Sequence, residues 1–269
     1  MKKITVVTVT YNCVKVIEET ILSVICQDYP NIEYIIIDGA SIDGTIDVIK
    51  KYAENITYWV SEPDNGLYDA MNKAIMVATG DYINFMNAGD SFCASDVIRR
   101  IVEQIEDDTI VAHGDIMKIA KGYRYRACPP SIEKASERMP AYHQAAFTQL
   151  SYHKLNLFDL QYKSSADYNF FYQAVLKNHV KFQYIPILVA NFDCCDGTSN
   201  VNYKRSQRES LKIRGDNNNW KKKLRLEWWF FTVDVKRWVK KHLMSEEKSR
   251  NIEVSRLRKE GYDIQLDKK

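Results

Sequence analysis

The sequence predicts an α/β fold with a Rossmann-like, mainly parallel mixed sheet that helices flank on both sides. Two observations support this prediction: strand and helix patterns alternate from residue 3 to residue 106, and the strands are nearly continuous apolar runs. A strand with one face in water would instead alternate apolar and polar residues. With 269 residues, 45% of them hydrophobic, the chain is long enough to bury a sizeable core.

Each element of this first half has its own signal. Strands are predicted where β-branched residues cluster, over 3–10, 32–38, 56–60 and 81–86. Helices are predicted between them by apolar residues at helical spacing, over 14–27, 45–53, 67–78 and 95–106. Asp43 and Thr45 offer a turn and an N-cap for the second helix, and Gly80 ends the third.

The pattern loosens after residue 109. Further elements are predicted in this order: short strands over 109–120 and 123–127, a proline-containing loop over 128–142, and an aromatic-rich helix over 166–178. Residues 179–193 indicate either a strand pair or one long bent strand, interrupted by Pro186. We place the end of the α/β domain at residue 203, so that residues 204–269 form a helical, basic and aromatic extension.

The formal net charge of +3 is unevenly distributed along the chain. Residues 1–203 carry −7, residues 204–243 carry +9 and residues 244–269 carry +1. An acidic body with a basic segment predicts two surfaces with different partners. Because the acidic body would repel a phosphate backbone, no nucleic-acid partner is expected.

The sequence also bears on the compartment. No run of 18 or more apolar residues occurs, so no transmembrane helix is predicted. The first apolar run ends at Asn12 without a small-residue cleavage site, which is typical of a first strand rather than of a signal peptide. The six cysteines include no C-x-x-C pair, which disfavours a disulfide scaffold and a structural zinc site. We therefore expect a cytoplasmic protein with reduced thiols.

Polar residues follow each of the four predicted strands, at the carboxyl ends where ligands bind in open α/β sheets. These segments are 10–12, 38–45, 61–66 and 87–90. Their carboxylates and amides would accept hydrogen bonds from a base or ribose, or hold a hard divalent cation. The chain contains neither G-x-x-x-x-G-K-[ST] nor G-x-G-x-x-G, which disfavours a P-loop enzyme and a standard dinucleotide dehydrogenase.

Each of these side chains also has a purely structural interpretation. Asp43 is best explained as part of a turn and a helix cap. Asp38 closes an apolar strand, where an unpaired carboxylate is costly, and a functional role is therefore favoured. The run Asp64-Asn65-Gly66 fits a turn as well as it fits a binding loop.

Taken together, the segments resemble a family 2 glycosyltransferase of the GT-A fold, a class rich in bacterial polysaccharide-biosynthesis enzymes. The matching stretches occur in the family's order over roughly residues 3–200: VVTVTYN, IIIDGASIDGT, SEPDNGLYDAMNKAI, GDYINFMNAGD, YHQAAF and SADYNFF. The resemblance implies a nucleotide pocket lined by Thr10, Tyr11, Asp38, Asp64 and Asn72. It also implies that Asp90 would hold Mg²⁺ or Mn²⁺ on the diphosphate and that Asp167 would be the catalytic base.

The metal motif departs from the family's usual D-x-D, because residues 87–90 are Asn-Ala-Gly-Asp. Asn87 offers a neutral oxygen in place of a charge. One carboxylate together with substrate phosphates is compatible with Mg²⁺, which keeps several of its waters. Metal affinity without nucleotide would then be weak, and a metal-independent reaction is the alternative.

Sugar transfer requires that the leaving diphosphate be neutralised and that the acceptor hydroxyl lose its proton. A single base opposite the leaving group gives direct displacement with inversion, and the resemblance assigns that base to Asp167. Without the resemblance, Asp167 would be explained as a favourable charge at a helix N-terminus. His143 and Gln144 form a second candidate cluster that would orient the acceptor or a phosphate, although a lone histidine is more often structural.

Residues 219–243 are aromatic in the middle and basic at both ends, and they contain four of the five tryptophans. This composition is typical of an interfacial helix on an anionic membrane surface. A dimerisation helix and a helix packed on the catalytic domain are the alternatives.

We therefore expect an inverting glycosyltransferase that moves a sugar from a nucleotide-diphosphate donor, a UDP-sugar in the first instance, to a hydroxyl. The acceptor would be a glycan or a polyprenyl-linked sugar in cell-surface polysaccharide biosynthesis, at the inner face of the cell membrane. A non-catalytic sugar-nucleotide- or membrane-binding protein on the same fold is the alternative, which the missing D-x-D carboxylates support. A nucleotidyltransferase is disfavoured, because the chain lacks a Gly-rich, Arg/Lys-containing N-terminal loop.

Overall fold

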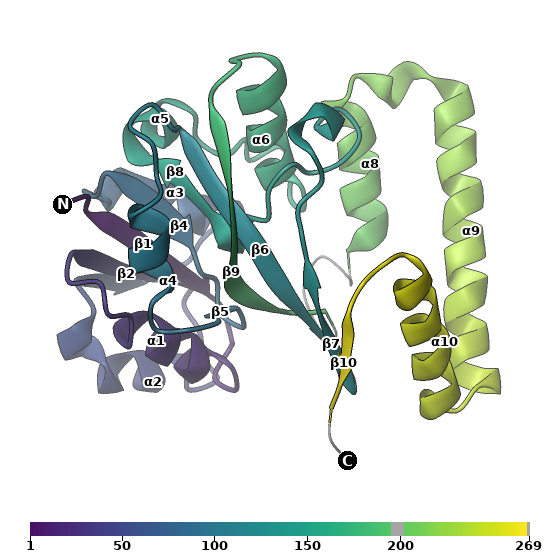
Figure 1. The fold of residues 1–269 in the computed structure, drawn as a ribbon, viewed down its shortest axis with the longest axis horizontal. Helices are drawn as coiled ribbons and strands as arrows, with labels where there is room; N and C mark the ends of the chain where they lie inside the picture. The colour runs from purple at the N-terminus through teal and green to yellow at the C-terminus, as the bar shows by residue number, and fades with distance from the viewer. Residues whose placement is uncertain (195–201, 268–269) are drawn as a thin grey trace. The chain divides into compact units, whose positions relative to one another are not determined.

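The computed structural model describes residues 1–194 and 202–267, and the chain divides into two compact units. The first unit joins Met1–Met117 to Cys128–Phe192. The second joins Lys118–Ala127 to Asp193–Lys269. The helices and strands of each unit can be followed in Figure 1.

Four parallel strands form the N-terminal half of the sheet in the first unit, in the order β4-β1-β2-β3. They are β1 (Ile4–Thr10), β2 (Ile32–Asp38), β3 (Tyr58–Ser61) and β4 (Tyr82–Phe85). Every residue of β1 is buried, as are six of the seven residues of β2. Burial on both faces explains why these strands are continuous apolar runs rather than alternating ones.

Helices flank these strands (Figure 1). They are α1 (Ile17–Ile25), α2 (Thr45–Lys51), α3 (Leu67–Val77) and α4 (Val97–Val102), with a 3₁₀ turn η1 (Ala53–Asn55). Each of the four α-helices lies within its predicted range and is shorter than predicted at one end or at both. In α1 the difference has a visible cause, because a turn in which Val16 N and Ile17 N both donate to Cys13 O precedes the helix.

Four further strands complete the sheet of the first unit. Its strands are β5 (Ser91–Phe92), β6 (Val111–Ala120), β8 (Ala146–Gln149) and β9 (Phe182–Asp193). β8 lies between β4 and β6 and is antiparallel to both, while β9 pairs with β5 and β6. Of the two predictions for residues 179–193, the single long strand is the one observed, and Pro186 lies inside it. The pairs β4–β8, β6–β8 and β5–β9 are antiparallel, so the sheet is mixed, as predicted.

The remaining helical elements of the first unit are short except for one. They are the 3₁₀ turns η2 (Ile132–Lys134) and η3 (His143–Ala145) and the helices α5 (Leu150–Leu155) and α6 (Ala166–Leu176). Neither β8 nor α5 was predicted from the sequence, whereas α6 was.

The second unit consists mainly of helices. They are α8 (Tyr203–Ile213), η4 (Asp216–Asn218), α9 (Trp220–Leu243) and α10 (Glu246–Lys259), and strand β10 (Ile264–Leu266) pairs antiparallel with β7 (Tyr123–Ala127). α9 and α10 both begin at side-chain caps, where Asn219 accepts from Lys222 N and Ser245 from Lys248 N. A small core joins Tyr123 of β7 to the apolar side of α10 and to β10.

Two observations concern the predicted compartment. Within residues 1–194 and 202–267, no helix combines the length and the apolar character needed to cross a membrane. The cysteines in these ranges are free thiols, namely Cys13, Cys26, Cys93, Cys128 and Cys194. Cys195 lies outside the described residues.

A buried carboxylate on β2 ties three segments of the first unit together. Glu33 is 5% exposed and accepts hydrogen bonds from Thr5 Oγ1 at 2.6 Å, Thr79 N at 2.7 Å and Lys3 Nζ at 2.9 Å. Burial raises the pKa of Glu33, but the hydrogen bonds lower it by more than burial raises it. The resulting pKa is about 2. The folded state therefore favours the charged form of Glu33.

Glu33→Gln is expected to destabilise the fold, and the loss should depend on pH. Because the folded-state pKa of Glu33 is depressed from 4.5 to about 2, its contribution is complete above 4.5 and disappears as the pH falls through 2. Urea unfolding at about pH 7 should show a loss of about 2 to 3 kcal/mol, and less than half of that at about pH 3. Glu54→Gln, at an exposed site, is the control. An equal loss at both pH values would contradict this account.

Candidate active site

The carboxyl ends of β1, β2 and β3 lie side by side in the sheet. The register places Thr10 opposite Asp38, and Asp38 opposite Ser61. Asp38 is completely buried and accepts hydrogen bonds from Ser41 N at 2.9 Å, from Ser61 Oγ at 2.6 Å and from Ser41 Oγ. These three bonds offset the cost of burying the carboxylate. Asp38 thereby fixes the loops that follow β2 and β3.

The loops after β1 and β2 are also bonded to each other. Asn12 N donates to Ser41 Oγ at 2.7 Å, and Ile42 N donates to Asn12 Oδ1 at 2.9 Å. Both loops contain a residue with left-handed backbone, Asn12 at φ 50° and Ala40 at φ 63°. A left-handed conformation costs an alanine about 1 kcal/mol or more, and it persists here because the surrounding hydrogen bonds hold it.

Three of the predicted nucleotide-pocket residues lie around Gly39. The ring of Tyr11 is 62% exposed at the end of β1. A Cβ atom at Gly39 would lie 2.6 Å from Asp64 Oδ2 and 3.4 Å from Tyr11 Cδ2, so a larger residue there would have to displace the Asp64 carboxylate. Asp64 Oδ1 in turn accepts from Gly66 N at 2.7 Å. Thr10 Oγ1 is buried and has no hydrogen-bond partner among the described residues.

Asn72 has a different environment from these three residues. Its Nδ2 donates to Phe158 O at 2.9 Å, and its Oδ1 accepts from Phe158 N at 2.9 Å. The amide group of α3 thus holds the chain after α5 in place. The nucleotide contact predicted for Asn72 stays a prediction, and the observed contacts are structural.

The second group of predicted residues meets at His143. Its Nε2 lies 3.8 Å from Asp90 Oδ2 and 3.3 Å from Asn87 Nδ2, and its Nδ1 lies 3.5 Å from Asp167 Oδ2. Asn87 and Asp90 follow β4, His143 begins η3, and Asp167 lies in the first turn of α6. Three segments far apart in the sequence therefore bring two carboxylates to one imidazole.

The two carboxylates change the acid–base behaviour of His143. Burial lowers the pKa of His143, but the hydrogen bond to Asp167 and the negative charges of Asp167 and Asp90 raise it more. The net pKa lies above the ordinary value of 6.5. The two carboxylates thus stabilise the positive charge that His143 carries when it is protonated.

One oxygen of Asp167 is held firmly and the other is not. Oδ1 accepts from Tyr68 OH at 2.8 Å and from Tyr168 N at 2.8 Å. Oδ2 lies 3.5 Å from His143 Nδ1, which is longer than a good hydrogen bond. Tyr68 is 6% exposed and comes from α3. The carboxylate is thus oriented through one oxygen and keeps proton-accepting capacity on the other.

The segment around Asn87 fits a hard cation in part. Asn87 Oδ1 is buried without a partner among the described residues, and Asp90 is 8% exposed. An orphaned amide oxygen beside a carboxylate is a suitable pair of ligands for Mg²⁺ or Mn²⁺. Within residues 1–194 and 202–267 no group of three or more His, Cys, Asp or Glu side chains could hold a metal ion. Oxygens of a bound substrate would have to complete the coordination.

Gln144 is 2% exposed, and the structure fixes it through its backbone. Asn84 Nδ2 on β4 donates to Gln144 O at 3.0 Å and to Ala146 O at 3.0 Å. Asn84 thus holds the segment that carries His143. Sequence reasoning missed this role, as it missed Tyr68, although Tyr68 lies inside one of the stretches that carried the family resemblance.

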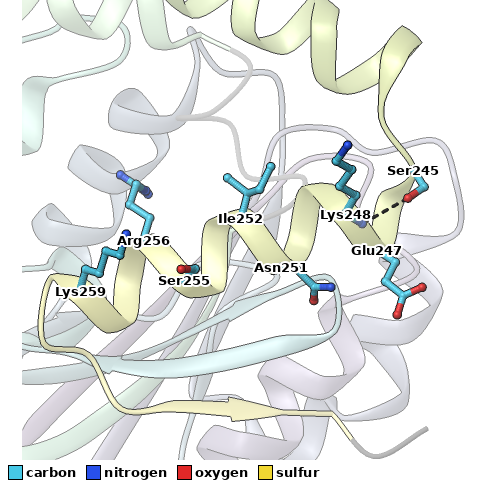
Figure 2. A pocket seen from close by; sticks show the side chains of 8 residues that line it. All are labelled: Ser245, Glu247, Lys248, Asn251, Ile252, Ser255, Arg256 and Lys259. Carbon is cyan, nitrogen blue, oxygen red and sulfur yellow. Dashed lines mark hydrogen bonds between the residues drawn. The ribbon is translucent and has the colours of Figure 1, made fainter.

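A shallow hollow lies along the outer side of α10 in the second unit (Figure 2). It is lined by Ser245, Glu247, Lys248, Asn251, Ile252, Ser255, Arg256 and Lys259, all of them exposed. Figure 2 shows that these side chains come from one helix and its cap. None of the predicted site residues is among them, and we assign no chemistry to this hollow.

Comparison with known proteins gives a consistent result. The sequence profile described as Glycosyl transferase family 2 matches residues 5–183. An uncharacterised glycosyltransferase of Mycobacterium tuberculosis is 34% identical over 220 residues, which are 79% of this chain and 80% of that protein. TuaG of Bacillus subtilis, described as a teichuronic acid biosynthesis glycosyltransferase, is 37% identical over 92 residues, which are 33% of this chain and 36% of that protein.

Two solved structures show the likeness of fold. Staphylococcus aureus TarS in complex with UDP-GlcNAc has a TM-score of 0.63 at 18% identity over 78% of this chain, which spans 66% of the TarS chain. The mannosyltransferase PcManGT of Pyrobaculum calidifontis, in complex with GDP-Man and Mn²⁺, has a TM-score of 0.62 at 16% identity. That match covers 95% of this chain and 80% of the mannosyltransferase. The likeness confirms the predicted α/β fold.

Asn72→Ala is expected to lower the free energy of unfolding by about 1 to 3 kcal/mol, because it leaves both backbone groups of Phe158 without a side-chain partner. Urea denaturation measures the loss. Asn218→Ala, at an exposed position of η4, is the matched control and should change stability by less than about 0.5 kcal/mol. If Asn72→Ala were equally mild, the amide would not hold the chain at Phe158.

Proposed function

Because the chain belongs to glycosyl transferase family 2 and has its GT-A fold, we propose that it is an inverting enzyme. It would transfer a sugar from a nucleotide-diphosphate donor to a hydroxyl of a glycan or lipid-linked acceptor. The observation that carries this proposal is the cluster of Asp167, His143 and Asp90. Asp167 would be a positioned carboxylate for the acceptor. Asp90, the second carboxylate, would hold a cation for the leaving diphosphate.

Asp167 is the proposed base. The acceptor oxygen would form a bond to the anomeric carbon while its proton passes to Asp167 Oδ2. At the same time the bond from the anomeric carbon to the diphosphate oxygen breaks, and its electron pair leaves with the nucleoside diphosphate. Tyr68 and the backbone of Tyr168 hold Oδ1, so that Oδ2 keeps a fixed direction during the proton transfer.

The leaving diphosphate needs positive charge beside it. Asp90 and the buried Oδ1 of Asn87 would hold Mg²⁺ or Mn²⁺, and the similar mannosyltransferase structure, which contains Mn²⁺, supports this assignment. A bound divalent ion would neutralise charge on the diphosphate as a Lewis acid. His143, whose pKa the neighbouring carboxylates raise, would add a second positive charge next to Asp90 when it is protonated.

The donor nucleotide would lie over the ends of β1 and β2. There the exposed ring of Tyr11 offers a face to a nucleobase, and Thr10 Oγ1 and the carboxylate of Asp64 offer hydrogen bonds to a base or ribose. We propose a UDP-sugar first, since the similar TarS structure contains UDP-GlcNAc. The similar mannosyltransferase structure contains GDP-Man, so GDP-sugars belong in the same test.

The proposed biological setting is the synthesis of a cell-surface polysaccharide on the cytoplasmic side of the membrane. The similarity to TuaG, a protein described by its role in teichuronic acid biosynthesis, supports it. A lipid-linked acceptor would also give a reason for the basic, aromatic segment 219–243 to contact an anionic membrane surface.

Asp167→Asn is expected to abolish transfer while leaving nucleotide binding intact. The donor is chosen by a thermal-shift screen of UDP- and GDP-sugars with Mn²⁺, because a ligand of the folded state raises its melting temperature. With that donor, release of the nucleoside diphosphate should fall by roughly a thousandfold or more, since the amide cannot accept the proton. The variant should bind UDP or GDP as tightly as the wild type does in calorimetry.

Two outcomes of this experiment would contradict the proposal. Near wild-type turnover by Asp167→Asn would show that Asp167 is not the base. Binding of a sugar nucleotide by the wild type without any transfer or hydrolysis would instead favour the non-catalytic alternative.

Tyr68→Phe tests the orientation of the base. Tyr68 donates to Asp167 Oδ1 but does not itself accept the acceptor proton, so it is a positioning residue. Loss of this hydrogen bond should lower kcat by roughly tenfold and leave the KM for the donor nearly unchanged. Tyr58→Phe removes an exposed hydroxyl from β3 and is the matched control. A change in the donor KM with an unchanged kcat would assign Tyr68 to donor binding instead.

A further inference from the structure

α9 carries a continuous row of exposed apolar side chains along one face. The row consists of Trp220, Leu224, Trp228, Phe231, Val235 and Trp238, which are between 43% and 68% exposed. Successive members are three or four residues apart, which is the spacing that keeps side chains on one side of an α-helix. We call this row the α9 stripe. Its length along the helix distinguishes it from the scattered apolar residues found on most protein surfaces.

The interior contacts of α9 use another face. Phe230, at 2% exposure the buried residue of this helix, packs against Tyr203 of α8 with ring centroids 5.7 Å apart. Both acidic residues of α9 also pair with α8: Glu227 with Arg208 at 2.9 Å and Asp234 with Lys204. Packing within the second unit therefore explains Phe230 but leaves the α9 stripe exposed.

Most charged side chains around the α9 stripe are basic. α9 contains eight Lys and Arg residues, and both of its acids are neutralised by the pairs with α8. Exposed cations on either side of the stripe form no ion pair with another described residue: Lys221, Lys223, Arg225, Lys236 and Lys241. The exposed part of the helix thus combines aromatic rings with unneutralised positive charge.

We propose that the α9 stripe docks this helix in the plane of an anionic lipid surface. Tryptophan and phenylalanine rings would enter the headgroup region, and the flanking lysines and arginines would contact lipid phosphates. The basic flanks argue against a second copy of the chain as the occupant, because two such helices face to face would bring like charges together. The inference goes beyond the proposed transfer reaction, since it requires neither donor nor base.

Vesicle binding tests this proposal directly on the full-length chain. The wild type should sediment with vesicles of phosphatidylglycerol and phosphatidylcholine, and not with phosphatidylcholine alone. Four of the five tryptophans lie on α9, so the intrinsic fluorescence should shift to the blue when the anionic vesicles bind. Equal binding to both vesicle types, or to neither, would overturn the proposal.

The apolar and the basic parts can be separated by variants. The double variant Trp228→Glu with Phe231→Glu should reduce vesicle affinity by at least roughly tenfold, because it places two carboxylates in the stripe. Leu155→Glu with Ile252→Glu introduces the same charges at exposed apolar positions outside α9 and should bind as the wild type does. Replacing Lys221, Arg225 and Lys236 by glutamine should weaken binding to anionic vesicles by roughly a hundredfold.

Sedimentation equilibrium without lipid tests the alternative that the α9 stripe binds a second copy of the chain. A monomeric wild type supports the lipid surface as the partner. A dimer that the variant Trp228→Glu with Phe231→Glu dissociates would assign the α9 stripe to a second copy of the chain and overturn the proposal. Both measurements are made without donor or acceptor, so their failure is distinct from a failure of the proposed transfer reaction.

Discussion

The buried carboxylate of Asp38 is the interaction on which the geometry of the candidate site depends. A charge with no exposure to solvent is tolerated only if it is fully hydrogen-bonded, and its donors are Ser41 in the loop after β2 and Ser61, the last residue of β3. Because the buried charge of Asp38 needs these hydrogen bonds, the segments that carry the donors are held in place. Ser41 extends this constraint to the loop after β1 through its bond with Asn12. The residues proposed to face a nucleotide are presented by loops that cannot move independently.

The cluster of Asp90, His143 and Asp167 differs from Asp38, because its side chains are less closely hydrogen-bonded to one another. Asp90 and Asp167 share His143, and their charges keep its pKa raised, but the distances of 3.8 and 3.5 Å are too long for well-made hydrogen bonds. Asn87 Oδ1 has no described partner. Asp38 and Glu33 accept several close hydrogen bonds, whereas Asn87 Oδ1 and Asp167 Oδ2 keep unused accepting capacity. This contrast favours ligand binding at the cluster over a purely structural role.

The sequence predicted the parts of the fold that local patterns determine. β2 has the predicted bounds and β1 differs by one residue, because both are fully buried apolar runs. β8 was missed since its four residues carry no period of their own and pair only with distant strands. The pairing of β7 with β10, more than 130 residues apart, was likewise invisible to local reasoning. The antiparallel pairing of β8 with β4 and β6 depends on such long-range contacts, which a strand–helix pattern does not encode.

For the candidate site, too, the sequence predicted the residue types but not the contacts between distant segments. The motifs identified which residue types lie at the strand ends. Asp43 closes a turn, as predicted, by accepting from Thr45 N at 3.0 Å, but the N-cap of α2 is Gly44, and no side chain caps this helix. Contacts that link segments far apart could not be predicted, including the bonds of Asn72 to Phe158 and of Tyr68 to Asp167. On α9 the sequence revealed the aromatic and basic composition, but which residues share a face with α8 is a property of packing. Phe230 packs on α8 and both acids of α9 pair with cations of α8, so the exposed aromatic rings are accompanied by Lys and Arg side chains that no acid of the same helix neutralises.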